Sequence, residues 1–220
     1  MKNTFKVFGI IAIIAVIGFS MAACKNGTTP TTPPGVDDTG GTITGSTITS
    51  GAPVTYTAGL PEEAKSRTNF SYTRGALDTW VLLSTIIDPP ASVTITNGKV
   101  DIKLGTPKSA SLEIITETDI PADITVTPSD AKSFRIRNFY TDDGAYNLYP
   151  AKGDDREAAL IYADKNVTLQ GTHTSPGLTE VYDISLKQGW NYVIYSESGS
   201  TVKNTASTTL PNGFKWTVSN

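Results

Sequence analysis

Residues 93–104 read VTITNGKVDIKL, two runs of alternating apolar and polar side chains joined by an Asn-Gly pair. Asn-Gly tolerates the positive φ angles of a type I′ turn, whose twist matches that of two antiparallel strands. Val100, Ile102 and Leu104 share one face of the second run, and charged side chains take the other. This stretch therefore predicts a β-hairpin with one buried face.

From about residue 60 onward the same alternation recurs, interrupted by clusters of Pro, Asp and Gly that are typical of turns. The further strands that this pattern predicts are 111–116, 123–127, 133–140, 159–163, 167–170, 182–187, 190–195 and 214–219. We therefore expect an all-β domain, an antiparallel two-layer β-sandwich of about eight to ten strands. A closed β-barrel is the alternative architecture.

One apolar stretch has two interpretations. Residues 77–87 read LDTWVLLSTII, which fits a buried strand or a helix with Leu77, Trp80, Leu83 and Ile87 on one face. The neighbouring strands, and the two prolines that follow, favour the strand. After Pro128, residues 129–132 allow one helical turn.

The first 23 residues have the composition of a secretory signal, with two lysines, an apolar stretch over 7–19 and small residues before Cys24. The competing interpretation is a membrane-spanning helix, which needs roughly 20 apolar residues. We favour a signal peptide over 1–23, because Cys24 stands where a cleavage site belongs.

Residues 24–59 are dominated by Thr, Gly, Pro and Ser and contain no aromatic side chain before Tyr56. This composition predicts a flexible tether, since it cannot build an apolar core. Its Thr-Ile-Thr repeats and residues 54–57 are long enough to pair as edge strands, an assignment that the sequence leaves open. Residues 60–220 then form a single β-sandwich domain.

Met21-Ala22-Ala23-Cys24 resembles the lipobox of bacterial lipoproteins, which usually has Leu where this chain has Met21. The resemblance implies a diacylglyceryl thioether on Cys24, signal cleavage before it and an acylated new N-terminus. The partner of the mature chain would then be the membrane, through two or three acyl chains, which hold far more stably than one. Lys25 after the anchor cysteine favours the outer membrane or cell surface.

Several motifs, in their order along the chain, resemble a group of uncharacterised spirochaete-type surface lipoproteins. They are the signal through Cys24 and residues 95–100, 162–168, 186–191 and 213–216. The resemblance implies an envelope location and a β-rich domain on a Thr/Gly-rich tether. It carries over no catalytic or ligand-binding residue.

The charge pattern argues against nucleic acid as a partner. The chain has 18 Lys and Arg against 21 Asp and Glu, and cleavage that removes Lys2 and Lys6 would change the net charge from −3 to −5. Binding to phosphates needs clustered basic side chains, and no basic run occurs.

His173 is the only histidine, in the segment GTHTSPG at 171–177, which the sequence predicts to be a loop. Once Cys24 is acylated, no free thiol remains, so a catalytic triad or metal site would have to include this histidine. No accompanying motif supports either, and we expect no cofactor and no metal.

The best candidate for a ligand-binding loop contains Tyr140, Asp142, Asp143, Tyr146 and Tyr149. Tyrosine rings combine a flat apolar face with a polar edge, which suits stacking on sugars. Carboxylates in this loop and at Asp154-Asp155 have the chemistry for calcium or for a glycosidase acid pair, but their spacing fits no known calcium loop. The aromatic residues Trp190, Tyr192 and Trp216 are expected to fill the core instead.

Together these features predict a lipid-anchored cell-envelope protein, a non-catalytic binding or structural module whose surface partner is a protein or a glycan. Two alternatives stay open. One is a carbohydrate-active enzyme built on carboxylates, and the other is a small-ligand carrier if the sheet closes into a barrel.

Overall fold

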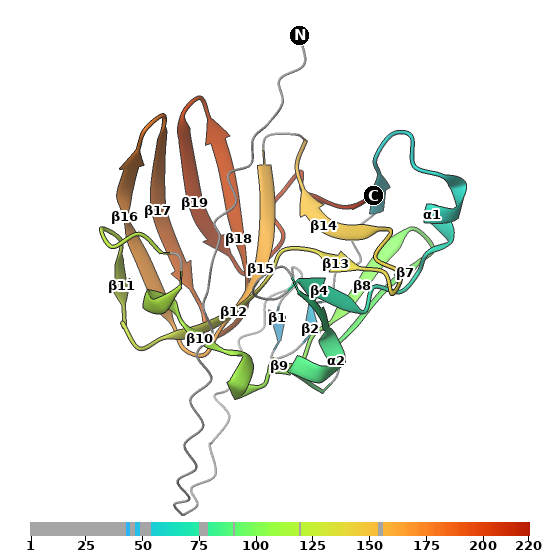
Figure 1. The fold of residues 1–220 in the computed structure, drawn as a ribbon, viewed down its shortest axis with the longest axis horizontal. Helices are drawn as coiled ribbons and strands as arrows, with labels where there is room; N and C mark the ends of the chain where they lie inside the picture. The colour runs from blue at the N-terminus through green and yellow to red at the C-terminus, as the bar shows by residue number, and fades with distance from the viewer. Residues whose placement is uncertain are drawn as a thin grey trace, which may run out of the picture.

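The computed structural model describes residues 43–44, 47–48, 54–74, 79–89, 91–118, 120–153 and 156–220. Strands dominate this part of the chain, and the fold is all-β, as the sequence predicts (Figure 1). Twenty strands are described, twice the predicted number, because half of them are pieces of two to three residues.

The largest sheet follows the path β11 (Thr125–Thr127), β16 (Val167–Ser175), β17 (Leu178–Leu186), β19 (Thr201–Ser207), β18 (Gly189–Ser198), β15 (Arg156–Ala163), β14 (Asn147–Ala151), β13 (Phe139–Tyr140), β4 (Tyr72–Arg74) and β5 (Trp80–Leu82). Two branches leave this path. β10 (Glu113–Ile114) and β12 (Lys132–Ile136) join it at β15, whereas β20 (Lys215–Ser219) and β3 (Val54–Tyr56) join it at β14.

A second sheet has the order β1 (Ile43–Thr44), β2 (Thr47–Ile48), β8 (Lys99–Lys103) and β7 (Ser92–Thr96), and β6 (Ile87–Asp88) pairs with β9 (Thr106–Pro107). Across the described residues these sheets are open and curled. They are consistent with the predicted sandwich and not with the closed barrel. The short helical elements are α1 (Glu62–Ser66), α2 (Leu83–Ile86) and two 3₁₀ turns, Ser109–Ser111 and Ile115–Glu117.

Not every pairing is antiparallel. β19 turns back from β18 and inserts between β18 and β17, so it runs parallel to β17. β3 also lies parallel to β20, with Val54 opposite Trp216 and Tyr56 opposite Val218. Strands β1, β2 and β3 all fall in the range predicted as tether, and β3 is bonded to the folded body, where Val54 N–H also donates to Gly98 O at 2.9 Å.

The predicted hairpin is confirmed. Asn97 and Gly98 form its turn with φ angles of 51° and 69°, between β7 and β8. The side chains of Val100, Ile102 and Leu104 are buried on one face, as the alternation requires.

Residues 79–87 are neither the favoured strand nor a continuous helix; Leu77, which the helix interpretation used, lies outside the described residues. β5 ends at Leu82, one helical turn follows in α2, and β6 begins at Ile87. The turn redirects the chain from the edge of the large sheet, where β5 pairs with β4, to a different partner, β9. Both Leu83 and Ile87 are buried as a result.

Three other local predictions differ from the structure. The strand predicted at 111–116 is reduced to β10, with 3₁₀ turns on both sides, because Ile115 must turn inward, where its N–H donates to Ala131 O at 2.9 Å. The strand predicted at 133–140 is split into β12 and β13. Residues 129–132 contain a turn and the start of β12 in place of a helical turn.

The buried apolar side chains form two clusters. The larger one, which includes Trp190, Tyr192 and Trp216, occupies the centre of the molecule. The smaller one lies between the β16 to β18 part of the sheet and the segment from Ile115 to Ala131. Phe214, Trp216 and Val218 all point inward, as the alternation in 214–219 predicts.

Candidate functional site

The candidate ligand-binding loop connects β13 to β14 and is closed by hydrogen bonds at its base. Thr141 N–H donates to Tyr146 O at 3.0 Å, and Gly144 N–H donates to Thr141 O at 3.0 Å. Gly144 has a φ of 69°, a conformation that suits a residue without Cβ. The loop is therefore a defined turn, and each of its side chains has a fixed direction.

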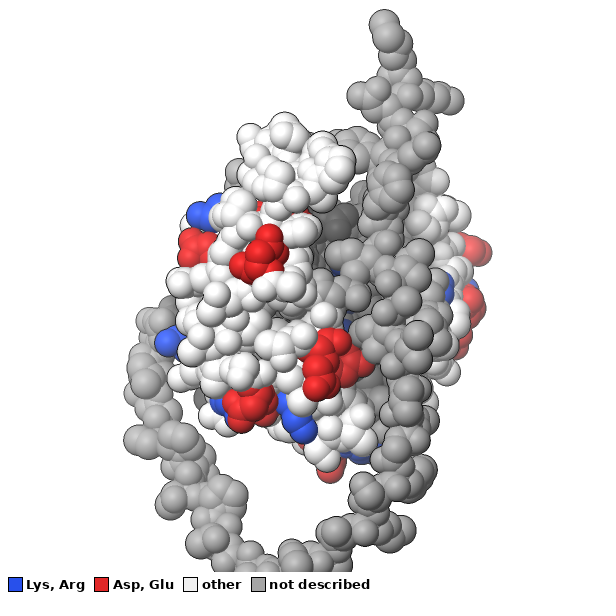
Figure 2. Space-filling model, turned by 60° about the vertical axis from the view of Figure 1, so that its left-hand side comes forward, with Lys and Arg blue, Asp and Glu red and all other residues white. Residues whose placement is uncertain are grey.

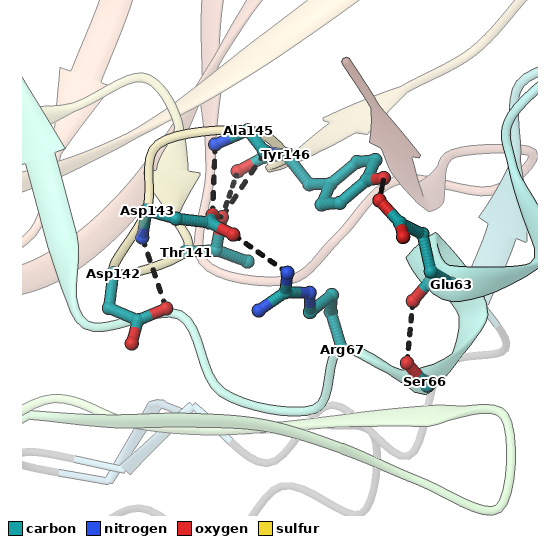
Figure 3. A network of polar contacts seen from close by, with 8 residues as sticks. All are labelled: Glu63, Ser66, Arg67, Thr141, Asp142, Asp143, Ala145 and Tyr146. Atoms are coloured by element: carbon teal, nitrogen blue, oxygen red, sulfur yellow. Dashed lines mark hydrogen bonds and ion pairs between the residues drawn. The ribbon is translucent and has the colours of Figure 1, made fainter.

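Asp143 uses its carboxylate to organise the loop itself (Figure 3). It accepts hydrogen bonds from the Thr141 hydroxyl at 2.6 Å and from Ala145 N–H at 3.0 Å. Arg67 approaches it from outside the loop, with Nη2 at 2.8 Å. The Thr141 hydroxyl, then the Ala145 amide and more weakly Arg67, lower the pKa of Asp143 because all of them favour the ionised carboxylate.

Tyr146 is a core residue and not part of the exposed surface, since only 4% of it is exposed. Its hydroxyl donates to Glu63 Oε1 at 2.9 Å, and this bond, with burial, raises the pKa of Tyr146. Glu63 in α1 and Arg67 just after it thus hold the loop from one side (Figure 3). The three other predicted residues differ in position. Tyr140 is half-buried in β13, Asp142 is exposed in the loop, and Tyr149 is half-buried in β14, opposite Thr217.

Asp143→Ala is expected to lower the melting temperature at neutral pH, because the variant removes the acceptor for three donors. The folded pKa of Asp143 is lowered from 3.8, so its contribution is present above that value and disappears as pH falls through the lower folded value. Melting curves of wild type and variant from pH 7 to pH 2 should therefore converge in acid. Asp142→Ala, one residue away, is the matched control, because it removes the acceptor for one donor, Asp143 N–H at 3.0 Å, and should have the smaller effect. A gap that stays constant over this range, or an equal effect of Asp142→Ala, would contradict the assignment.

The most exposed large aromatic side chain at this site is Trp80, which the sequence pattern did not single out as a surface residue. It is 45% exposed, although it makes contacts with several neighbours. Its ring centroid lies 4.9 Å from that of Tyr140 and 6.2 Å from that of Tyr72, both in edge-to-face geometry. The guanidinium carbon of Arg74 lies 4.3 Å from the Trp80 ring centroid and 5.4 Å from that of Tyr140. We call these four residues the Trp80 cluster.

The Trp80 cluster is joined to the candidate loop through Gly144. A Cβ on Gly144 would lie 2.8 Å from two atoms of the Trp80 six-membered ring, so the indole packs directly on the glycine backbone. Of the five residues predicted for the site, Tyr140 belongs to the cluster, and Asp142 is exposed two residues from Gly144. Tyr146 and Asp143 support the loop from within.

The chain matches no protein-family model, no curated protein and no solved structure. What the protein does must therefore be argued from its own residues.

The second candidate, His173, is in a strand and not in the predicted loop. β16 extends to Ser175, which places His173 opposite Glu180 of β17. Its Nδ1 lies 3.0 Å from both carboxylate oxygens of Asp123, in a half-exposed pair. Within the described residues, no group of three His, Cys, Asp or Glu side chains has the arrangement of a metal site.

The predicted signal peptide over 1–23, Cys24, most of the tether and Asp154-Asp155 lie outside the described residues. Among the residues that are described, no helix is both long enough and apolar enough to span a bilayer. On the face drawn in Figure 2, charged side chains of both signs occur in small separate groups on a largely uncharged surface.

Proposed function

We propose that this protein is a lipid-anchored protein of the bacterial cell envelope, whose β domain is a non-catalytic binding module at the outer membrane or cell surface. The resemblance of residues 21–24 to a lipobox, and of the chain to spirochaete-type surface lipoproteins, supports the anchor and its location. The observation that carries the binding function is the exposed indole of Trp80, which three other side chains and the backbone of Gly144 hold in a fixed position.

A fixed, exposed tryptophan is typical of a recognition surface. Its indole has a large apolar area that is costly to leave in water, and an ordered side chain loses little conformational entropy when it binds. Ordinary packing would have buried this residue, as it does Trp190 and Trp216. A partner that covered the indole would remove this apolar area from water, which supports a binding role for the Trp80 cluster.

The chemistry of the loop favours binding over catalysis. A glycosidase needs two carboxyl groups that face one bond, about 5 to 10 Å apart. In this loop the carboxylate of Asp143 is engaged by Thr141, Ala145 and Arg67, and that of Asp142 accepts a hydrogen bond from Asp143 N–H at 3.0 Å, so both carboxylates act within the loop. The small-ligand carrier depended on a closed barrel, and the described sheets are open.

Cys24→Ser is expected to abolish lipid attachment and to leave an unprocessed precursor, because the thiol is the acylated atom in the proposed lipoprotein. Cells that express either form can be labelled with a clickable palmitate analogue and analysed by gel mobility. Met21→Leu, which restores the usual lipobox residue, is the matched control and should keep the label. Absence of label on the wild-type protein, or equal label on Cys24→Ser, would refute the anchor.

A further inference from the structure

We propose that the Trp80 cluster is a carbohydrate-binding site in which a pyranose ring stacks on the exposed part of the Trp80 indole. This inference rests on the proposed binding function and names the chemical class of the ligand.

The first argument is the pre-organised position of the indole. Tyr140 and Tyr72 pack against it at interplanar angles of 75° and 80°, and Gly144 lies so close that even a methyl group would not fit between them. Arg74 lies within cation–π distance of the indole and helps to fix its plane. A sugar that stacks on this ring would not have to order it first, which matters for a ligand that makes few contacts.

The second argument is the polarity of the surroundings. One face of a pyranose carries C–H groups, and its rim carries hydroxyls that both donate and accept hydrogen bonds. An indole matches the apolar face, and exposed polar groups nearby match the rim. Asp142 is exposed two residues from Gly144, in the loop on which Trp80 packs, and its carboxylate is a strong acceptor for sugar hydroxyls.

The third argument separates a glycan from a protein partner. Protein interfaces have an apolar centre made of several side chains, usually over several hundred Å². In the described part of the chain, the exposed large apolar side chains are Trp80 and Leu178, and Leu178 begins β17 at the turn of the β16–β17 hairpin. Among the described residues Trp80 is thus a well exposed ring with only the half-buried rings of Tyr72 and Tyr140 beside it, a small apolar area that suits stacking on a single sugar ring.

The test uses the fact that Trp80 is the exposed one of three tryptophans, since Trp190 and Trp216 are 1% and 0% exposed. The full-length chain is kept in lauryldimethylamine oxide micelles, a detergent without a sugar headgroup. It is titrated with cellotetraose, chitotetraose, mannotetraose and galactotetraose. We expect at least one of them to bind in calorimetry and to shift the tryptophan emission to shorter wavelength.

The variants then locate the site. Trp80→Ala should weaken binding about thirtyfold, the effect of removing a central tryptophan anchor. Leu178→Ala, which removes the other exposed large apolar side chain, should leave the affinity within about twofold. Melting curves check that both variants fold. If Trp80→Ala does not fold, the emission shift of the wild-type protein shows whether the sugar binds at Trp80, because the two other tryptophans are buried and shielded from ligand.

Three results would overturn the inference: no tetrasaccharide binds, binding leaves the emission unchanged, or a folded Trp80→Ala binds as tightly as Leu178→Ala. Capture of an envelope protein through Trp80, with no sugar bound, would also overturn it while leaving the proposed binding module intact. Loss of the anchor is detected separately by acyl labelling of Cys24. Failure of the glycan inference and failure of the proposed function are therefore distinguishable.

Discussion

Gly105→Ala is expected to lower the free energy of unfolding by about 3 kcal/mol, the upper end of the usual cost of overpacking. A Cβ at this position would clash with Pro89 O and would lie 2.6 Å from the carbonyl carbon and oxygen of Asp88. These atoms belong to backbone, so no side chain can rotate away to make room. The Gly105 carbonyl also accepts the Trp190 Nε1–H bond at 2.9 Å, so a shift of the chain here would weaken a buried hydrogen bond.

A urea titration of the variant measures this loss, and Gly199→Ala is its control. Gly199 has a φ of 62° and open space where the added methyl group would lie, so the substitution adds only the strain of a left-handed residue, roughly 1 to 2 kcal/mol. Gly105→Ala should be clearly the worse of the two. Equal losses would mean that the backbone at residues 88 and 89 moves aside without cost.

Trp216→Ala is expected to destabilise the protein by about 3 to 5 kcal/mol, the usual cost of removing a large buried aromatic side chain. Trp216 is completely buried, and its ring centroid lies 6.0 Å from that of Phe139. Its Nε1 has no hydrogen-bond partner among the described residues, so the loss comes from packing and from the cavity that remains.

Lys215→Ala, on the opposite face of the same strand, should change the free energy of unfolding by less than about 0.5 kcal/mol, because Lys215 is exposed. The contrast between these neighbours tests the orientation of β20. Two equally mild variants in a denaturant titration would show that Trp216 does not pack as the structure has it.

The sequence predicted correctly those strands and turns whose conformation is determined by residues close to them along the chain. In the 93–104 hairpin, the turn residues and the alternation are both local, and each can be recognised without knowing what the strand packs against. The same holds for β20, where Phe214, Trp216 and Val218 alternate with polar residues. These predictions are confirmed because local pattern and tertiary packing require the same conformation.

Predictions failed where distant partners determine the conformation. The apolar run at 79–87 serves two sheets, so its helical turn depends on β4 and β9, which the run itself does not encode. β16 extends past Gly171 through the segment predicted as a loop because β17 pairs with it residue by residue as far as Ser175. Gly171 is poor local evidence for a strand, and the pairing outweighs it.

In the candidate site, too, local features were predicted from the sequence and contacts between distant residues were not. The surface position of the loop after Tyr140 followed from its turn residues, whereas the roles of Asp143 and Tyr146 depend on Arg67 and Glu63, more than 70 positions earlier in the sequence. The exposed position of Trp80 was missed because its segment follows neither the strand nor the helix alternation clearly. The one signal in the sequence was an aromatic residue in such an ambiguous segment.

The pairing of β3 with β20 has a consequence for the order of folding. Thr55 and Thr217 share a hydrogen bond across 162 positions, so this part of the sheet joins the beginning of the folded body to its last strand. Contacts between such distant residues form slowly, and a chain made from its N-terminus cannot form this one until Lys215–Ser219 has been synthesised. Until then Val54–Tyr56 lacks its partner strand and the central cluster lacks Trp216. During synthesis, the domain therefore stays open to proteases and chaperones until β20 has been made.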